Sequence, residues 1–178
     1  MLPLELELAG VKLHLQPSAR SALRYRAWYG ESVLTALNRC GDSKSMEGTL
    51  LRMCQVMLEE RDAMSLEELA RLARRDGSFF LKGLLARDAL LARDDSQGAL
   101  PTKGGGDGRP FDEYDILTIA AEAGLPGTLL DELPILHLAG VAGRYFALQD
   151  PDRKTYRMLD SEEMAQLYPR AKKKRETS

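Results

Sequence analysis

Two runs of strictly alternating side chains at the start of the chain constrain its fold most strongly. Leucine occupies every second position of Leu4–Leu8, and apolar residues occupy every second position of Val11–Leu15. A period of two places one set of side chains on one face of a strand, and Ala9-Gly10 between the runs suits a turn. The pattern predicts a β-hairpin with one leucine face. Because an isolated hairpin is marginally stable, that face must pack on another element.

Helical periodicity dominates the rest of the sequence. Pro17 suits a first helical turn and Gly30 suits a C-terminal cap. Between them, Ala19, Leu23 and Ala27 recur at four-residue spacing, with Ala22 on the same side, which predicts the buried stripe of this helix. Further apolar stripes predict helices over residues 45–60, 65–75, 79–93, 111–123 and 134–149, with a last short helix over 160–169.

Local signals mark two of these helix starts. Ser65 followed by Glu68 three residues later matches a capping box, with Ser65 as the N-cap. The acidic cluster Asp112, Glu113 and Asp115 invites a metal or general-acid hypothesis. Carboxylates in a first helical turn, however, also interact favourably with the helix dipole and the free amides there. We therefore interpret the cluster as the start of a helix.

A glycine-rich break divides the chain. Residues 94–110 contain Gly104-Gly105-Gly106 and almost no apolar side chains, which is typical of a linker. The lysine–serine/threonine ending of a phosphate-binding loop is missing, and no strand is expected before the glycines. The fold class is therefore mainly α (α+β), an N-terminal β-hairpin followed by a helical bundle and a smaller C-terminal helical segment. The expected parts are a hairpin and helical domain (1–93), a linker (94–110), the smaller helical segment (111–169) and a basic tail (170–178).

Charge and hydropathy exclude several classes of protein. The formal net charge is −2, whereas dedicated nucleic-acid-binding domains usually carry a basic excess. The basic run at residues 170–175 is interpreted as a solvated tail, with a nucleic-acid contact as the alternative. No segment approaches the roughly 20 apolar residues needed to cross a bilayer. The N-terminus, with Pro3 and Glu5, does not have the composition of a signal peptide. We expect a cytoplasmic protein without membrane or nucleic-acid partners.

Residues suited to catalysis or metal binding are few. The two cysteines, Cys40 and Cys54, lack the paired spacing of a metal site, and Cys54 falls on an apolar helical stripe. His14 lies on the polar face of the second strand, and His137 lies among leucines in a predicted helix. A cysteine–histidine pair would need a local activating motif, which neither cysteine has. We expect a binding protein that is not an enzyme and that uses no metal or cofactor.

Aromatic and methionine side chains are candidates for a protein-binding surface. Three aromatic residues lie within reach of one another at the end of the first helix. Two methionines lie in the helix predicted over residues 45–60, and a third follows it. Tryptophan and tyrosine anchor interfaces, and methionine adapts to varied surfaces. Packing inside the core is the alternative interpretation for both sets. The candidate residues are Tyr25, Trp28, Tyr29, Met53, Met57 and Met64.

The order of these features resembles tail assembly chaperones of long-tailed bacteriophages and related prophages. The likeness rests on the leucine hairpin, on Tyr29-Gly30-Glu31-Ser32-Val33-Leu34 after the first helix, and on a later helical part. That part begins with Phe111-Asp112-Glu113-Tyr114-Asp115 and ends with Ala120-Ala121-Glu122-Ala123-Gly124-Leu125. The likeness spans most of residues 4–138, and residues beyond Pro134 do not match the family pattern.

The resemblance implies a function in tail assembly. Such a protein is expected to bind the tape measure protein, keep it soluble and help recruit tail tube subunits. It would act in the host cytoplasm and be absent from the mature virion. Many members are made in two forms by ribosomal frameshifting, and Lys172-Lys173-Lys174 is a candidate for a slippery codon run. A virion structural adaptor (a tail completion or neck component) and a nucleic-acid-binding regulator that uses Arg20, Arg24, Arg26 and the basic tail are the alternatives. Homo-oligomerisation is left open.

Overall fold

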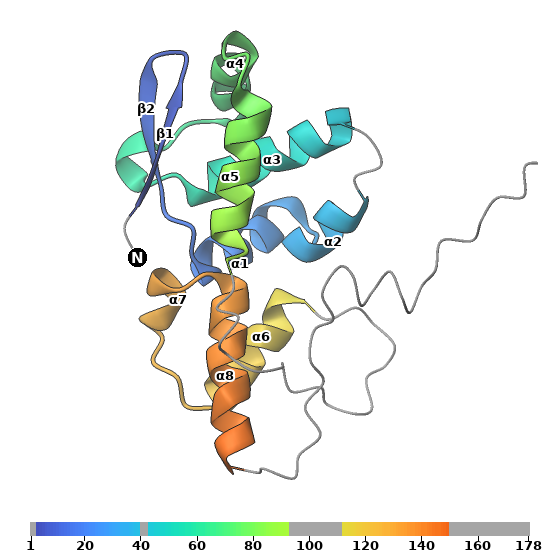
Figure 1. Cartoon of the computed structure of the whole chain (residues 1–178), viewed down its shortest axis with the longest axis vertical. Helices are drawn as coiled ribbons and strands as arrows, with labels where there is room; N and C mark the ends of the chain where they lie inside the picture. The colour runs from blue at the N-terminus through green and yellow to red at the C-terminus, as the bar shows by residue number, and fades with distance from the viewer. Residues whose placement is uncertain (1–2, 40–42, 93–111, 150–178) are drawn as a thin grey trace, which may run out of the picture.

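The chain folds into a mainly helical protein that begins with a β-hairpin, as the sequence predicts (Figure 1). The computed structural model describes residues 3–39, 43–92 and 112–149. The residues expected to form the linker (94–110), the basic tail (170–178) and a last short helix (160–169) lie outside these ranges, as does Cys40.

The hairpin forms where the sequence predicts it, with its turn at Ala9 and Gly10. β1 (Leu4–Leu8) pairs antiparallel with β2 (Val11–Leu15), so that Leu4 lies opposite Leu15. Ala9 and Gly10 form the turn with φ of 49° and 83°, and two-residue turns with positive φ at both positions match the twist of the strands that they join. One face of the hairpin is covered by the rest of the molecule, and its buried residues are Leu6, Leu8, Leu13 and Leu15.

Helices make up most of the remaining described chain. They are α1 (Ala19–Tyr29), α2 (Val33–Arg39), α3 (Ser43–Met57), α4 (Leu66–Arg75), α5 (Phe79–Leu90), α6 (Glu113–Glu122), α7 (Leu129–Glu132) and α8 (Ile135–Gln149), with a 3₁₀ turn, η1 (Glu60–Asp62). The helices predicted from periodicity within the described ranges are thus confirmed. Ser18 is the N-cap of α1, so Pro17 precedes this helix and does not lie in its first turn.

The two predicted helix-start signals are both N-terminal caps. The Ser65 Oγ accepts a hydrogen bond from the Glu68 N–H at 3.2 Å, and the Glu68 carboxylate accepts one from the Ser65 N–H at 2.9 Å. The Asp112 carboxylate accepts from the N–H groups of Tyr114 and Asp115, and the Asp115 carboxylate accepts from the Asp112 N–H at 3.0 Å. The acidic cluster therefore includes a second capping box, at the start of α6.

The buried face of α1 differs from the predicted stripe. Ala19 and Ala22 are fully buried, as predicted. Tyr25 is fully buried as well, whereas Leu23 is half-buried and Ala27 is exposed. Ala19, Ala22 and Tyr25 recur at a spacing of three and not four, and α1 is in contact with α3, α6 and α8. The apolar residues of a short helix can be grouped into more than one stripe. The stripe that faces the core is the one that contains the large Tyr25 ring.

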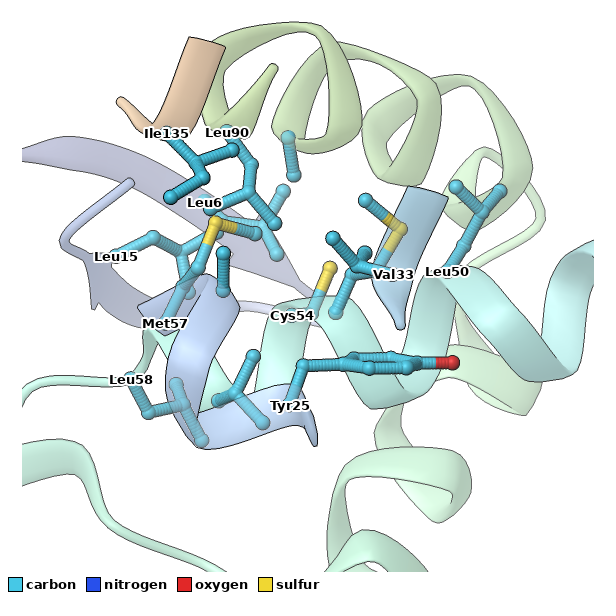
Figure 2. Packing of buried hydrophobic residues seen from close by; sticks show 14 of the residues in the cluster. Leu6, Leu15, Tyr25, Val33, Leu50, Cys54, Met57, Leu58, Leu90 and Ile135 are labelled. Atoms are coloured by element: carbon cyan, nitrogen blue, oxygen red, sulfur yellow. The ribbon is translucent and has the colours of Figure 1, made fainter. Parts of the chain in front are cut away.

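One hydrophobic core joins the hairpin to helices on both sides of residues 93–111. It contains residues of the hairpin, of α3 and α5, and of α6 and α8, and Figure 2 shows Leu6, Leu90 and Ile135 close together. α1 lies at the centre of the molecule and contacts α3 and α5 as well as α6, α7 and α8. The expected C-terminal helical segment therefore packs against the N-terminal part in its described portion, residues 112–149.

Candidate protein-binding surface

An exposed tryptophan stands on the outer face of α1. Trp28 is 56% exposed, and the Arg24 guanidinium one turn earlier lies 5.8 Å from the centre of its indole ring. A guanidinium at this distance from a ring is attracted by the π-electrons. Arg24 is itself held, because its Nη1 donates a hydrogen bond to the Val56 carbonyl at 3.1 Å. Trp28 and Arg24 thus form an ordered pair on the surface of a regular helix.

The neighbouring tyrosines explain why the indole faces outwards. Tyr25 is fully buried against the core, and the half-buried Tyr29 donates a hydrogen bond from its hydroxyl to the Gln55 side chain of α3. The two tyrosine rings lie 5.0 Å apart. Since both turn towards α3, the Trp28 side chain between them in sequence lies on the solvent side. Figure 2 shows the Tyr25 ring lying across the core beside α3.

A polar pocket of about 310 Å³ adjoins Arg24. Arg20 and Asp131 form an ion pair across it, with the Arg20 Nη2 donating to Asp131 at 2.9 Å, and this hydrogen bond lowers the pKa of Asp131. The pocket lies where α1 begins, between the end of α3 and α7. Its lining residues are Gln16, Ser18, Arg20, Ser21, Arg24, Met57, Leu58, Glu59, Glu60 and Asp131.

The tryptophan and the pocket together have the layout of a small protein-binding site. Arg20 and Asp131 are about half exposed, with side-chain exposures of 51% and 45%, so that their charges remain in contact with water. Protein interfaces usually combine an aromatic or arginine anchor with a polar, solvent-accessible rim. Trp28 and Arg24 supply the anchor, and the pocket supplies the rim. We call Trp28, Arg24, Arg20 and Asp131 the α1 surface.

The other candidate residues lie mainly in the core. Met53 and Met57 are fully buried in α3, as is Tyr25 in α1. Met64 is half-buried and packs against the core. These four side chains fill space between elements, and a partner that docks on the surface cannot reach the three that are fully buried. Of the six candidate residues, Trp28 alone is exposed, and the sequence did not distinguish it from its neighbours.

A second group of exposed apolar side chains lies on α5. Leu81 and Leu85 are 66% and 64% exposed, and Phe80 is 37% exposed. The opposite side of α5 packs into the core through Phe79, Ala86 and Leu90. The sequence predicted a richly apolar helix here and did not reveal that part of it faces solvent. We call Phe80, Leu81 and Leu85 the α5 face.

His14 pairs with a carboxylate at the edge of the hairpin. Its Nδ1 lies 2.7 Å from the Asp62 Oδ2, and its backbone N–H donates to the same oxygen at 2.6 Å. These hydrogen bonds, the backbone one first, lower the pKa of Asp62. The Glu59 N–H donates to the His14 carbonyl at 2.9 Å. The contacts tie β2 to η1, a connection that the sequence did not predict.

The remaining nucleophilic and metal-binding side chains are dispersed. Burial in α3 raises the pKa of the Cys54 thiol to about 12, so that this group is protonated at neutral pH. Within the described ranges, no three side chains of histidine, cysteine, aspartate or glutamate gather into a group that could hold a metal ion. Asp112 and Asp115 are engaged with the start of α6 and with each other.

A buried carboxylate joins two helices that are distant in sequence. Glu113 is fully buried at the start of α6. Its Oε1 accepts hydrogen bonds from the Ser32 hydroxyl at 2.9 Å and from the Val33 N–H at 2.8 Å. Glu113 therefore caps the first turn of α2 from another element. Sequence reasoning missed this contact, because the signal at Glu113 was local and its partners lie some 80 positions away.

Comparisons with known proteins do not assign this chain to a family. No protein-family model matches the sequence, and neither the curated proteins nor the solved structures contain a match. The contacts and exposures of the described residues are therefore the structural basis for a functional proposal. Among the helices of the described ranges, none combines the length and the apolar character needed to span a bilayer.

Proposed function

We propose that this chain is a tail assembly chaperone of a long-tailed bacteriophage or related prophage. It would bind the tape measure protein, keep it soluble and help recruit tail tube subunits, acting in the host cytoplasm and leaving before the virion is complete. The sequence resemblance supplies the identity of these partners. The observation that carries the binding role is the exposed Trp28, held beside Arg24 on the outer face of α1.

The α1 surface suits reversible binding of a helical client. A chaperone must cover apolar, helix-prone segments and release them later, and amphipathic helices dock through apolar anchors at helical spacing. The Trp28 ring offers a large apolar area at little conformational cost, since Arg24 already lies against it. The charged groups of the rim, Arg20 and Asp131, would remain hydrated around the contact.

A nucleic-acid-binding role is less well supported by the same geometry. α4 and α5 are consecutive short helices, and in a helix-turn-helix the second would enter the major groove. The exposed positions of α5 are Phe80, Leu81, Leu85 and Asp88. Three of these side chains are apolar and the fourth is acidic, whereas base edges are recognised largely by hydrogen-bonding side chains and the phosphates attract basic ones. The α5 face therefore favours an apolar partner.

Co-expression with the tape measure protein from the same genome tests the proposal. We expect a complex that survives size-exclusion chromatography and a larger soluble fraction of the tape measure protein. Replacing Trp28 by alanine should weaken binding by about 2 kcal/mol, which is roughly 30-fold in Kd. Tyr145→Ala serves as the matched control, because Tyr145 is an exposed aromatic residue on α8; its affinity should stay within about threefold of the parent chain.

Two outcomes would contradict different parts of the proposal. If the two proteins form no complex and the tape measure protein gains no solubility, the chaperone function is wrong. If a complex forms and Trp28→Ala binds as well as the parent chain, the chaperone function stands and the assignment of Trp28 as its anchor is wrong. Equal losses for Trp28→Ala and Tyr145→Ala would likewise remove the special role of the α1 surface.

A further inference from the structure

The two leucines of the α5 face lie between two exposed polar residues on the same side of the helix. Ser78, Leu81, Leu85 and Asp88 recur at spacings of three, four and three, and all four are exposed. Alternating spacings of three and four form the seam along which a second helix packs in a coiled coil. Figure 1 shows α5 in front of α3, with no described element in front of it. The seam is therefore open to a partner.

The start of α5 is the positive end of this seam. α4 ends with Arg74 and Arg75, which are exposed and have no acidic partner among the described residues. The first turn of α5 contains no acidic side chain, and the N-cap Ser78 gives the helix no side-chain hydrogen bond. The N–H groups of a first turn carry partial positive charge. Lys82 adds little to this excess, because its ammonium group is bound by Asp76 at 2.8 Å.

The end of α5 is the negative end of the seam. Asp88 lies in the last turn, and its side chain is 62% exposed. The neighbouring Arg87 donates two hydrogen bonds to it, at 2.9 Å and 2.6 Å, and Oδ1 accepts both. An exposed ion pair of this kind is worth little, so Asp88 can take a second cationic partner. A carboxylate near the C-terminus of its own helix is also unfavourable for the helix dipole, and a positive partner offsets this effect.

An antiparallel copy of α5 complements the seam along its length. Two helices related by a twofold axis can place each Leu81 opposite Leu85 of the other copy. Asp88 follows Leu85 by three residues, and Ser78 precedes Leu81 by the same number. In that register each Asp88 comes opposite Ser78, at the positive start of the other copy's α5. Leucines meet in the middle and opposite charges meet at both ends, so the surface is complementary to itself, as an isologous contact requires.

We propose that the protein forms a twofold-symmetric dimer in which the α5 faces of two copies pack antiparallel, with each Asp88 against Arg74 and Arg75 of the other copy. A helical client could also cover the leucines, but the charges at the two ends of the seam match a second α5. Two helices of 12 residues bury less than the roughly 1,200–2,000 Å² of a standard interface. We therefore expect a weak dimer, with a Kd on the order of 100 μM. The proposal does not rest on the chaperone function, since it concerns contacts between copies of the chain alone.

Sedimentation equilibrium of the full chain, at concentrations up to about 1 mM, tests whether the dimer exists. We expect the parent chain to pass from monomer to dimer as its concentration rises. Leu81→Glu with Leu85→Glu places like charges at the centre of the contact and should weaken self-association at least about tenfold. Leu148→Glu changes a leucine that is 75% exposed on α8, and this matched control should leave self-association unchanged. Circular dichroism of each variant confirms that the fold is retained.

Charge reversal tests the antiparallel register. Asp88→Lys places a lysine against the two arginines at each end of the dimer, and Arg74→Glu with Arg75→Glu places two glutamates against Asp88. Each variant alone should self-associate at least about tenfold more weakly than the parent chain, because like charges then meet at both ends. When the two variants are mixed, opposite charges meet again at both ends. A heterodimer should therefore form, with an affinity near that of the parent dimer.

Several results would overturn the proposal. A parent chain that stays monomeric at about 1 mM would do so, as would a dimer that Leu81→Glu with Leu85→Glu leaves intact. A mixture of the two charge variants that shows no heterodimer would exclude the antiparallel register. If the parent chain is monomeric and binds a helical client that the leucine variant no longer binds, the α5 face serves that client and not a second copy.

Discussion

Glu113 reaches from the first turn of α6 to the first turn of α2. Its Oε1 accepts from the Ser32 hydroxyl and from the Val33 N–H, and the whole side chain is buried. The first amides of a helix have no partner within the helix and need an acceptor from elsewhere. A buried carboxylate is costly unless it is hydrogen-bonded. Oε1 meets the first need and part of the second, whereas the buried Oε2 has no hydrogen-bond partner among the described residues. The contact ties α6 to the start of α2.

Replacing Glu113 tests this connection. Glu113→Ala should lower the free energy of unfolding by about 1–3 kcal/mol, because two buried donors lose their acceptor. Glu113→Gln keeps one side-chain oxygen and should cost less. Urea denaturation measures both, and Glu132→Ala, which changes an exposed glutamate at the end of α7, should stay within about 0.5 kcal/mol of the parent chain. If Glu113→Ala and Glu113→Gln lowered the free energy of unfolding equally, the hydrogen bonds that the Glu113 oxygen accepts would not be the source of the effect.

Asp62 gives the stability of the hairpin junction a dependence on pH. Its pKa is lowered by the hydrogen bonds from His14. A carboxyl whose pKa is lower in the folded state stabilises the fold above its ordinary pKa of about 3.9, and this contribution is lost as the pH falls through the lowered value. Asp62→Asn should therefore be less stable than the parent chain at neutral pH, and the difference should shrink below about pH 4. Thermal melts of both proteins across the acid range measure this difference in stability. If the difference stayed the same at every pH, the stabilising role of the ionised Asp62 would be wrong.

Residue chemistry alone could locate the candidate site only in outline. The sequence placed Tyr25, Trp28 and Tyr29 together at one helix end, which the structure confirms. Which ring faces solvent depends on α3, where the Gln55 side chain accepts a hydrogen bond from the Tyr29 hydroxyl. Asp131, which completes the rim by pairing with Arg20, comes from a separate helix 111 positions away. Contacts over such separations leave no local pattern in the sequence.

For the helices and strands, the sequence was sufficient to predict where several of them begin or end, but not which of their faces are buried. The Ser65–Glu68 capping box and the Ala9-Gly10 turn depend on residues within a few positions of one another, so local chemistry suffices to identify them. The buried stripe of α1 and the exposed face of α5 depend on which neighbours pack where. Apolar residues surround much of α5, and the elements packed against it (α3, α1 and β1) decide which of them are buried, such as Ala86, and which are exposed, such as Leu85.

Gly83 sets how closely α3 and α5 approach. A Cβ at this position would lie 3.0 Å from the Leu50 Cβ and 3.1 Å from its Cδ1. Alanine usually favours a helix over glycine by about 1 kcal/mol, but overpacking a core usually costs about 1–3 kcal/mol. Since the Leu50 Cβ is fixed to the backbone of α3, the two helices would have to separate. Gly83→Ala should therefore destabilise the protein.

Gly48 provides the matched control for that substitution. It lies within α3, and a Cβ there would meet nothing within 4 Å. Gly48→Ala should stabilise the fold by up to about 1 kcal/mol through helix propensity alone. Chemical denaturation of the two variants should thus give shifts of opposite sign. If Gly83→Ala were stabilised as much as Gly48→Ala, the close approach of α3 and α5 would be wrong.

For the whole molecule, the glycine-rich break suggested two parts, whereas the described residues on both sides of it share one main core, beside a small cluster of α6 and α8 residues. A polar, glycine-rich stretch is a local property of composition, and it does not tell whether the flanking segments pack together. Packing depends on α1, whose surface is shared between α3 on one side and α6, α7 and α8 on the others. Ile116, Ile135 and Leu138 accordingly lie in the same cluster as the leucines of the hairpin.

A shared core predicts that both parts of the chain unfold together. Ile135 on α8 is fully buried, and Ile135→Ala should cost about 2–5 kcal/mol. Trp28, the chain's single tryptophan, reports on α1 by fluorescence, while far-ultraviolet circular dichroism reports on all helices. In one cooperative unit the two signals lose half their amplitude at the same denaturant concentration, and Ile135→Ala lowers both midpoints equally. Leu148→Ala, on the exposed side of the same helix, should shift neither. Ile135→Ala could instead lower the midpoint of an early circular dichroism transition and leave the midpoint of the Trp28 fluorescence transition unchanged. In that case α8 would unfold separately from α1, and the two parts would be separate domains.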